Sequence, residues 1–149
     1  IPKCLPKRVA FHDPCYLGRL GEPWIHWKGV PVPGNQRRFS PPKEFRRGTK
    51  GVYEPPRAII KAIPGVKLVE MERIKEYAWC CGAGGGVSES NPKFAAWTAR
   101  ERIAEARATG AEAIVTACPW CEKSFGGAIK ETGSELRVYD ILELVEKAI

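Results

Sequence analysis

The chain has 149 residues, 44% of them hydrophobic, and a formal net charge of +7, which is typical of one globular domain with a buried core. Charged residues make up 28% and aromatic residues 9%, so the composition excludes a disordered chain. No apolar run approaches the ~20 residues that a membrane helix needs. Residues 1–4 contain neither an initiator Met nor the apolar segment of a signal peptide, so we expect one domain of a longer cytoplasmic protein.

The first predicted element is a short strand over residues 8–11, which runs into His12-Asp13-Pro14-Cys15. Proline has no backbone N–H to donate and cannot continue a central strand. We therefore expect the chain to leave the sheet here and to present Cys15 in a loop. His12 is expected to cap this turn together with Asp13, or to serve as a proton carrier at a site near Cys15.

A long irregular loop is predicted over residues 18–51, which contain five prolines and no sustained period of 2 or 3.6. The loop is also the basic part of the chain. Between Arg19 and Lys50, eight basic residues stand against two acidic ones, which accounts for +6 of the net charge of +7. Tryptophan and phenylalanine among these basic residues are compatible with nucleic-acid binding, but docking onto a partner subunit or covering a site explains them equally well.

Strands and helices are predicted to alternate along the rest of the chain. The predicted elements are helix 55–63, strand 66–71, helix 92–109, strand 113–117, helix 119–132, strand 136–138 and helix 141–148. The strands are too far apart for hairpins, so they require crossover helices and parallel pairing. The sequence therefore predicts a layered α/β domain with a short, mainly parallel sheet flanked by helices.

Two of these helices carry more specific signals. Asp140 and Glu143 predict a capping box at the start of the last helix. In helix 92–109 a stripe of small and aliphatic side chains would let the helix lie close to a sheet. The predicted stripe consists of Ala96, Ala99, Ile103 and Ala106. Phe94 and Trp97 lie off this stripe and are expected to fill the core or to face a partner.

Five of the six cysteines follow or border the ends of predicted strands. In a parallel α/β sheet the carboxyl ends of the strands lie at one edge, where ligands bind. Three segments far apart in the sequence are therefore expected to bring five sulfur atoms to one edge of the sheet. These cysteines are Cys15, Cys80, Cys81, Cys118 and Cys121.

Converging thiolates favour an iron–sulfur cluster, zinc or monovalent copper. A structural zinc ion or an ordinary cubane cluster takes four ligands, so a fifth cysteine indicates an unusual cluster or one cysteine held in reserve.

Disulfides are unusual in a cytoplasmic α/β domain. The glycines at positions 82–86 do not fit a dinucleotide fingerprint, because Val87 stands where Gly or Ala is required.

Three motifs are similar to those of the cysteine-rich CCG domain family. They are His12-Asp13-Pro14-Cys15-Tyr16-Leu17-Gly18-Arg19, Cys80-Cys81-Gly82-Ala83-Gly84-Gly85 and Cys118-Pro119-Trp120-Cys121. The family occurs in catalytic subunits of heterodisulfide reductases and in related subunits of glycolate oxidase, anaerobic glycerol-3-phosphate dehydrogenase and lactate-utilisation enzymes. The resemblance covers nearly all of residues 1–149, which we interpret as a single domain. The segment from Cys15 to Cys80 is longer than is usual in the family, and we interpret residues 20–50 as a basic loop insertion.

The resemblance implies a [4Fe–4S] cluster of the non-cubane type, bound by the five cysteines, in an oxidoreductase. Such a domain passes single electrons to or from a thiol, a disulfide or another substrate. The implied partners are a second CCG domain, a ferredoxin-type iron–sulfur domain or subunit, and flavin or membrane electron-transfer subunits. A membrane would then be reached only through a partner, and nucleic acid is not expected as a partner. Some family members hold zinc, so zinc remains an alternative metal.

Two other functions would account for part of the pattern. A structural zinc-binding interaction domain would use four of the cysteines without catalysis. A thioredoxin-like dithiol would use only Cys118 and Cys121, at a strand-to-helix junction where a helix N-terminus activates a thiol. The second alternative leaves three cysteines unexplained. Cys4 matches no motif position.

Overall fold

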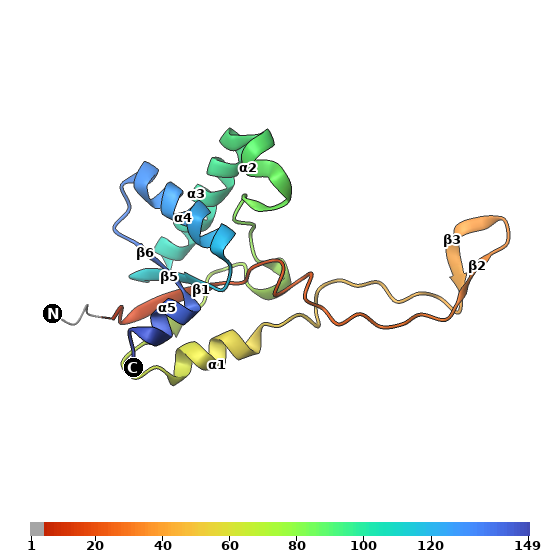
Figure 1. Ribbon diagram of the computed structural model, residues 1–149, viewed down its shortest axis with the longest axis horizontal. Coiled ribbons are helices and arrows are strands. Elements are labelled where there is room, and N and C mark those ends of the chain that lie inside the picture. Colours follow the sequence, from red (N-terminus) through yellow and green to blue (C-terminus); the bar gives the residue numbers. More distant parts are fainter. Residues whose placement is uncertain (1–4) are drawn as a thin grey trace.

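The body of the molecule is built on a four-stranded parallel sheet in the order β4-β1-β5-β6 (Figure 1). The computed structural model describes residues 5–149 apart from the side chains of Gln36 and Arg37, so Cys4 lies outside the described residues. The strands are β1 (Arg8–His12), β4 (Lys67–Val69), β5 (Ala113–Thr116) and β6 (Arg137–Asp140). His12 is in register with Thr116, so the two central strands end side by side at the carboxyl edge of the sheet.

Helices cover both faces of this sheet (Figure 1). They are α1 (Glu54–Ala62), α3 (Pro92–Ala108), α4 (Pro119–Thr132) and α5 (Ile141–Glu146). Alternate strand residues pack to opposite sides: Ala10 and Ile114 contact the layer of α3 and α4, whereas Val9 and Val115 contact the layer of α1 and α5. The predicted parallel α/β architecture is therefore confirmed. No helix within residues 5–149 is long and apolar enough to cross a bilayer.

The predicted start of α3 is confirmed, but its buried stripe differs from the prediction. Asn91 caps the helix, since its side-chain oxygen accepts a hydrogen bond from the backbone N–H of Phe94 at 3.2 Å. Ala95 is buried, whereas the predicted Ala96 is only half-buried. The cause is a contact that helical periodicity does not encode, because the first turns of α3 pack against a loop and not against the sheet. Trp79 in that loop donates its indole N–H to the carbonyl oxygen of Thr98 at 3.0 Å.

Only half of the predicted capping box forms at the start of α5. The Asp140 carboxylate accepts the backbone N–H of Leu142 at 2.8 Å, as a helix cap should. The Glu143 carboxylate instead accepts a hydrogen bond from the ammonium of Lys147, one turn later, at 2.5 Å. A charged partner at this spacing replaces the reciprocal contact to the backbone.

Short elements also lie in the predicted loop between β4 and α3, namely η1 (Lys75–Tyr77), η2 (Gly84–Gly86) and α2 (Val87–Ser90).

The prediction of an irregular loop over residues 18–51 is wrong for its central part. Strands β2 (Val30–Val32) and β3 (Asn35–Ser40) pair in an antiparallel hairpin at the end of a long projection from the body (Figure 1). The hairpin is stabilised by Trp27, which precedes β2. The ring of Trp27 packs edge-on against Phe39 of β3, with 4.7 Å between the ring centroids. The strands are too short and too rich in proline for an alternating pattern, and the tertiary contact is not visible in the sequence.

Candidate metal centre

The predicted cysteines all lie at, or return to, the carboxyl edge of the sheet. Cys15 comes three residues after β1 and is half-buried. Cys118, also half-buried, is the N-cap of α4 directly after β5, and Cys121 is buried in the first turn of that helix. Because β1 and β5 are neighbours, these three side chains start from adjacent strand ends.

Cys80 and Cys81 arrive from the edge strand β4 by way of a connecting loop. Arg19 joins this loop to the turn after Cys15, because its guanidinium donates hydrogen bonds to the carbonyl oxygens of Glu76 at 3.2 Å and Ala78 at 2.6 Å. No acidic side chain within residues 5–149 forms an ion pair with Arg19. The same arginine therefore fixes two cysteine segments relative to each other and leaves a positive charge beside them.

Two other thiols, those of Cys80 and Cys121, act on the thiol of Cys81. Donation to Cys121 and burial raise the pKa of Cys81 to about 12, against the lowering effect of the hydrogen bond from Cys80. A hydrogen bond to Cys81 and burial also raise the pKa of Cys80. The hydrogen bond from the backbone N–H of Gly82 and the positive charge of Arg19 lower this pKa, but by less. Without a metal the thiols of Cys80 and Cys81 therefore stay protonated at neutral pH.

The glycine after the cysteine pair is required by close packing. Gly82 has a φ of +81°, and a Cβ atom at this position would lie 2.5 Å from the carbonyl oxygen of Ala95. The backbone of the cysteine loop thus rests directly on α3. Its amides also face sulfur: the N–H of Gly82 lies 3.3 Å from the sulfur of Cys80, and the N–H of Ala83 lies 3.5 Å from that of Cys81.

The donor set fits a thiophilic metal group. All five cysteines are free thiols, and their segments meet at one edge. Two buried polar atoms at this edge, Arg102 Nη2 and Thr116 Oγ1, have no hydrogen-bond partner. Within residues 5–149 no group of three or more His, Cys, Asp or Glu side chains is arranged so that it could hold a metal ion. The structure thus brings the segments that carry the five cysteines to one edge of the sheet, but it does not gather three or more of their thiols into one site within the described residues.

His12 does not cap the turn before Cys15 as predicted. It is buried, its Nδ1 accepts a hydrogen bond from Nε of Arg102 at 3.1 Å, and its ring packs edge-on against Phe125. Burial lowers the pKa of His12 well below its usual value, and the charges of Arg102 and Arg19 lower it further. The imidazole is therefore neutral at pH 7 and is fixed by contacts to the helices of one face.

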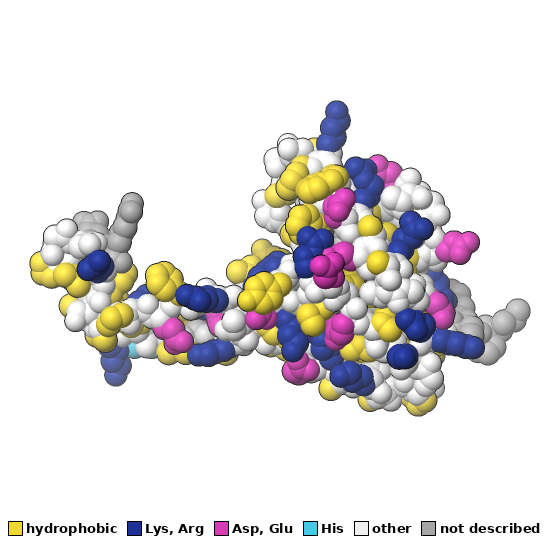
Figure 2. Space-filling view, turned by 180° about the vertical axis from the view of Figure 1, so that it is seen from behind, with side chains coloured by type: hydrophobic (Ala, Val, Ile, Leu, Met, Phe, Trp, Pro, Cys, Tyr) yellow, Lys and Arg dark blue, Asp and Glu magenta, His cyan; other side chains and the backbone are white. Residues whose placement is uncertain are grey.

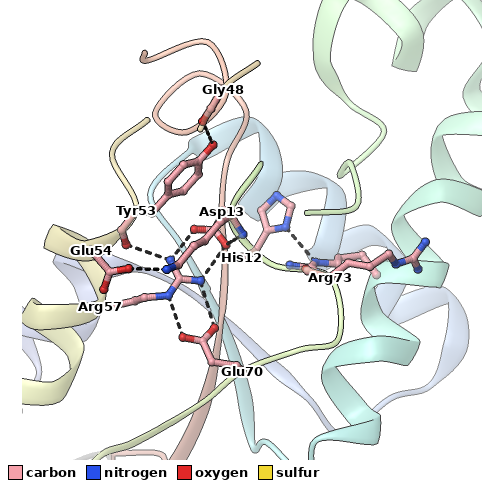
Figure 3. Close-up of polar contacts among 10 residues, drawn as sticks. His12, Asp13, Gly48, Tyr53, Glu54, Arg57, Glu70 and Arg73 are labelled. Carbon is pink, nitrogen blue, oxygen red and sulfur yellow. Dashed lines mark hydrogen bonds and ion pairs between the residues drawn. The ribbon is translucent and has the colours of Figure 1, made fainter. Parts of the chain in front are cut away.

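Asp13 likewise binds distant segments, and not its own turn. Its carboxylate accepts hydrogen bonds from both terminal nitrogens of Arg57 on α1, at 2.6 and 2.9 Å, and from the backbone N–H of Lys75 at 2.7 Å (Figure 3). Arg57 also contacts Glu70, with 2.7 Å between Nε and Oε1. This buried network joins β1, α1 and the segment that follows β4, and it therefore fixes the frame on which Cys15 and the cysteine pair are held.

Sequence reasoning missed three arginines that organise the site. Arg19 ends the first of the three motifs, and Arg57 ends the segment Gly51-Val52-Tyr53-Glu54-Pro55-Pro56-Arg57, which also resembles the family, so a signal was available for both. Arg102 had no such signal, because an arginine on an amphipathic helix is usually exposed. In the structure its side chain is fully buried between His12, Glu105 and the carbonyl oxygen of Arg73.

Because the pKa of His12 is lowered in the folded state, we expect the free energy of unfolding to depend on pH. Below pH 6.5 the unfolded chain binds a proton at this histidine that the folded chain does not bind. The free energy of unfolding should therefore fall as the pH falls below 6.5, by up to about 1.4 kcal/mol per pH unit, until the folded pKa is reached. His12→Gln should remove this contribution.

Urea unfolding of wild type and variant at about pH 7.5 and about pH 5.5 measures the difference. His26→Gln, at an exposed position, is the matched control and should keep the wild-type slope. An equal loss of stability with falling pH in wild type and His12→Gln would show that His12 is protonated in the folded state.

A comparison with protein families shows where the chain belongs. The sequence model of the cysteine-rich CCG domain matches residues 44–126, which is more than half of the chain. The chain belongs to the CCG cysteine-rich domain family. The matched range contains Cys80, Cys81, Cys118 and Cys121, whereas Cys15 precedes it on the other side of the projecting hairpin.

Curated relatives of this CCG domain are much longer proteins. It is 35% identical over 147 residues to a subunit of the dihydromethanophenazine:CoB–CoM heterodisulfide reductase of Methanosarcina acetivorans, covering 99% of the chain and 29% of the relative. It is 34% identical to the "Probable iron-sulfur-binding oxidoreductase FadF" of Bacillus subtilis, covering 97% of the chain and 17% of the relative. It is 33% identical to a "Probable membrane-anchored ferredoxin" of Chromohalobacter salexigens, covering 96% and 17%. The chain thus spans less than a third of the length of these relatives.

Proposed function

We propose that this CCG domain is an iron–sulfur-binding redox domain of an oxidoreductase. The observation that carries the proposal is that three separate segments, which together carry five free thiols, converge on the carboxyl edge of one sheet. Cys15, Cys80, Cys81, Cys118 and Cys121 are the proposed ligands. The relatives named as an iron–sulfur-binding oxidoreductase and as a reductase subunit support this function.

The proposed cofactor is a [4Fe–4S] cluster of the non-cubane type. When bound, it would supply one-electron chemistry and an iron that is open to a substrate thiolate. Holding it requires that the thiols of Cys80 and Cys81, whose pKa values are raised, lose their protons, so binding should release protons to solvent. Arg19 holds the two loops that carry Cys15 and Cys80, and its unpaired charge favours the thiolate form of Cys80.

The surrounding residues shield the site on its inner side. Cys81 and Cys121 belong to a buried cluster with Ala99, Ile103 and Phe125, so water is excluded from that side. On the outer side Cys80 is exposed. A thiol or disulfide substrate would therefore approach from the side of Cys80, and residues 1–149 would form one domain of a larger assembly.

The partners proposed for this assembly follow from the same relatives. The name of the reductase relative describes a subunit, and another relative is named a membrane-anchored ferredoxin. We accordingly expect further iron–sulfur domains or subunits, a second CCG domain, and flavin or membrane electron-transfer subunits to accompany this chain. Any association with a membrane would come through such a partner.

The metal content of anaerobically purified protein tests the proposal. We expect about four iron atoms and matching acid-labile sulfide per chain, with visible absorption and an EPR signal after reduction or oxidation. Cys81→Ser should abolish iron binding, because Cys81 is a proposed ligand and its thiol is buried at the inner side of the site. Cys4→Ser is the matched control, since Cys4 lies outside the motifs, and it should keep full iron content.

Zinc provides the outcome that would contradict the proposal. A single zinc ion that persists through anaerobic reconstitution with iron and sulfide would indicate a structural zinc domain. Full iron content in Cys81→Ser would instead exclude Cys81 as a ligand.

A further inference from the structure

A long basic projection, residues 23–47, has no role in the proposed metal centre. We call this segment the arm. It leaves the body after Glu22 and returns at Gly48, and the hairpin of β2 and β3 forms its tip, far from the sheet (Figure 1). In the space-filling view the arm is a narrow extension with hydrophobic and basic side chains on its surface (Figure 2).

The base of the arm is firmly fixed to the body. The buried carboxylate of Glu22 accepts the backbone N–H groups of Gly48 at 3.1 Å and Lys50 at 3.2 Å. The Tyr53 hydroxyl donates to the carbonyl oxygen of Gly48 at 2.6 Å (Figure 3). Gly48 has a φ of +81°, and a Cβ here would lie 2.9 Å from Cα of Arg19. The arm therefore starts from a defined position beside the cysteine segments.

The hairpin at the tip of the arm, by contrast, makes few packing contacts. Beyond the base, β2 and β3 pack chiefly against each other and against Trp27. The indole N–H of Trp27 donates to the carbonyl oxygen of Pro41 at 3.1 Å, which closes a very small core. A two-stranded hairpin alone is marginally stable in water. Contact with another surface would complete it.

Large apolar side chains of the arm are exposed to solvent. The exposed fractions are 72% for Trp24, 63% for Ile25, 63% for Val30 and 83% for Phe45. The exposure of four large apolar side chains on one narrow segment is typical of protein-binding surfaces. The two aliphatic side chains favour a protein partner over a nucleic acid. Ile25 and Val30 can pack against a protein surface, but they make no favourable contact with a phosphate backbone.

The charge of the arm indicates an acidic partner. Residues 23–47 contain six basic residues and one acidic residue, so most of the net charge of +7 lies on the arm. Lys28, Arg38, Lys43 and Arg47 form no ion pair within the described part of the chain. The rest of the chain is close to neutral, so a second copy of this domain does not offer the complementary charge.

The direction of the arm favours a separate polypeptide. The described chain starts and ends at the end of the body opposite to the arm (Figure 1). Further segments of the same chain would therefore emerge away from it. We propose that the arm is a docking element that binds an acidic, partly apolar surface of a separate partner subunit. This inference is independent of the metal at the cysteine site.

Zero-length cross-linking of the native complex tests the docking. The full-length protein is isolated with its bound subunits from its own cells and treated with a carbodiimide, which joins a lysine amine to a carboxylate only where the two are in contact. We expect Lys28 and Lys43 to be joined to Asp or Glu residues of a separate subunit. Cross-links only within the chain, no cross-links from these lysines, or nuclease-sensitive nucleic acid on the arm would each overturn the proposal.

Charge reversal on the arm gives an independent measurement. Arg38→Glu combined with Arg47→Glu should weaken binding of the cross-linked subunit by at least about tenfold at low salt. Lys61→Glu combined with Lys67→Glu makes the same charge change on exposed positions of the body and should leave binding unchanged. The arm variant should keep the wild-type metal content, so a failure here is distinguishable from a failure of the proposed redox function. Equal binding by both double variants would overturn the proposal.

Discussion

Replacement of Arg57 by leucine should lower the free energy of unfolding by about 3–5 kcal/mol. The side chain of Arg57 is 3% exposed and that of its partner Asp13 is 2% exposed. Without the guanidinium, the Asp13 carboxylate stays buried with only the backbone N–H of Lys75 as a partner. The cost is therefore mainly that of an uncompensated buried charge and exceeds the net value of the ion pair itself.

Urea unfolding followed by far-UV circular dichroism measures this loss. Arg100→Leu is the matched control, because Arg100 pairs with Glu131 on the surface and should contribute only about 0–1 kcal/mol. The double variant Arg57→Leu with Asp13→Leu should recover part of the loss, since no buried charge is left without a partner. If Arg57→Leu were no more harmful than Arg100→Leu, the network would not fix the frame of the site.

Replacement of Gly82 by alanine should have the second large effect, at the cysteine loop itself. A methyl group would meet the carbonyl oxygen of Ala95 at 2.5 Å and Cβ of Thr98 at 3.0 Å, in a backbone conformation that alanine rarely adopts. We expect a loss of about 2–4 kcal/mol of stability. Because the loop must move away from α3, Cys80 and Cys81 should lose their positions and the iron content should fall.

Gly84→Ala provides a control within the same glycine run. Nothing lies within 4 Å of a Cβ at Gly84, and its φ is outside the left-handed region. This variant should therefore keep wild-type stability and iron content. Thermal unfolding and iron analysis of the two variants, prepared side by side, compare them directly. Equal behaviour of the two would mean that the cysteine loop is not held by its contact with α3.

The sequence was sufficient for features that depend on local patterns. Buried strands such as residues 113–116, and helices bounded by proline and glycine, follow from periodicity and from end signals. The placement of Cys118 at the start of α4 follows from the same logic, because a strand and a helix meet there. The parallel pairing of β1 with β5 was also expected, and it places the segments that carry Cys15 and Cys118 after neighbouring strand ends.

Features that depend on tertiary contacts were not predictable in this way. The pairing of Asp13 with Arg57 joins residues far apart in the sequence, and no local signal ties either to the other. The burial of Arg102 depends on the neutral His12 beside it, which periodicity does not reveal. The hairpin in the arm depends on Trp27 and Phe39 meeting across a turn, so composition alone suggested an irregular loop.

The closed base of the arm has an evolutionary consequence. The backbone N–H of Val52 donates to the carbonyl oxygen of Leu17 at 3.1 Å, and Glu22 binds the returning chain at Gly48. Because these contacts bring the two ends of the arm together, the length of chain between them has no effect on the separation of Cys15 from the cysteine pair. Descendants of one ancestral domain could therefore gain, extend or lose this segment in a single genetic step, acquiring or exchanging binding partners while the five cysteines keep their places.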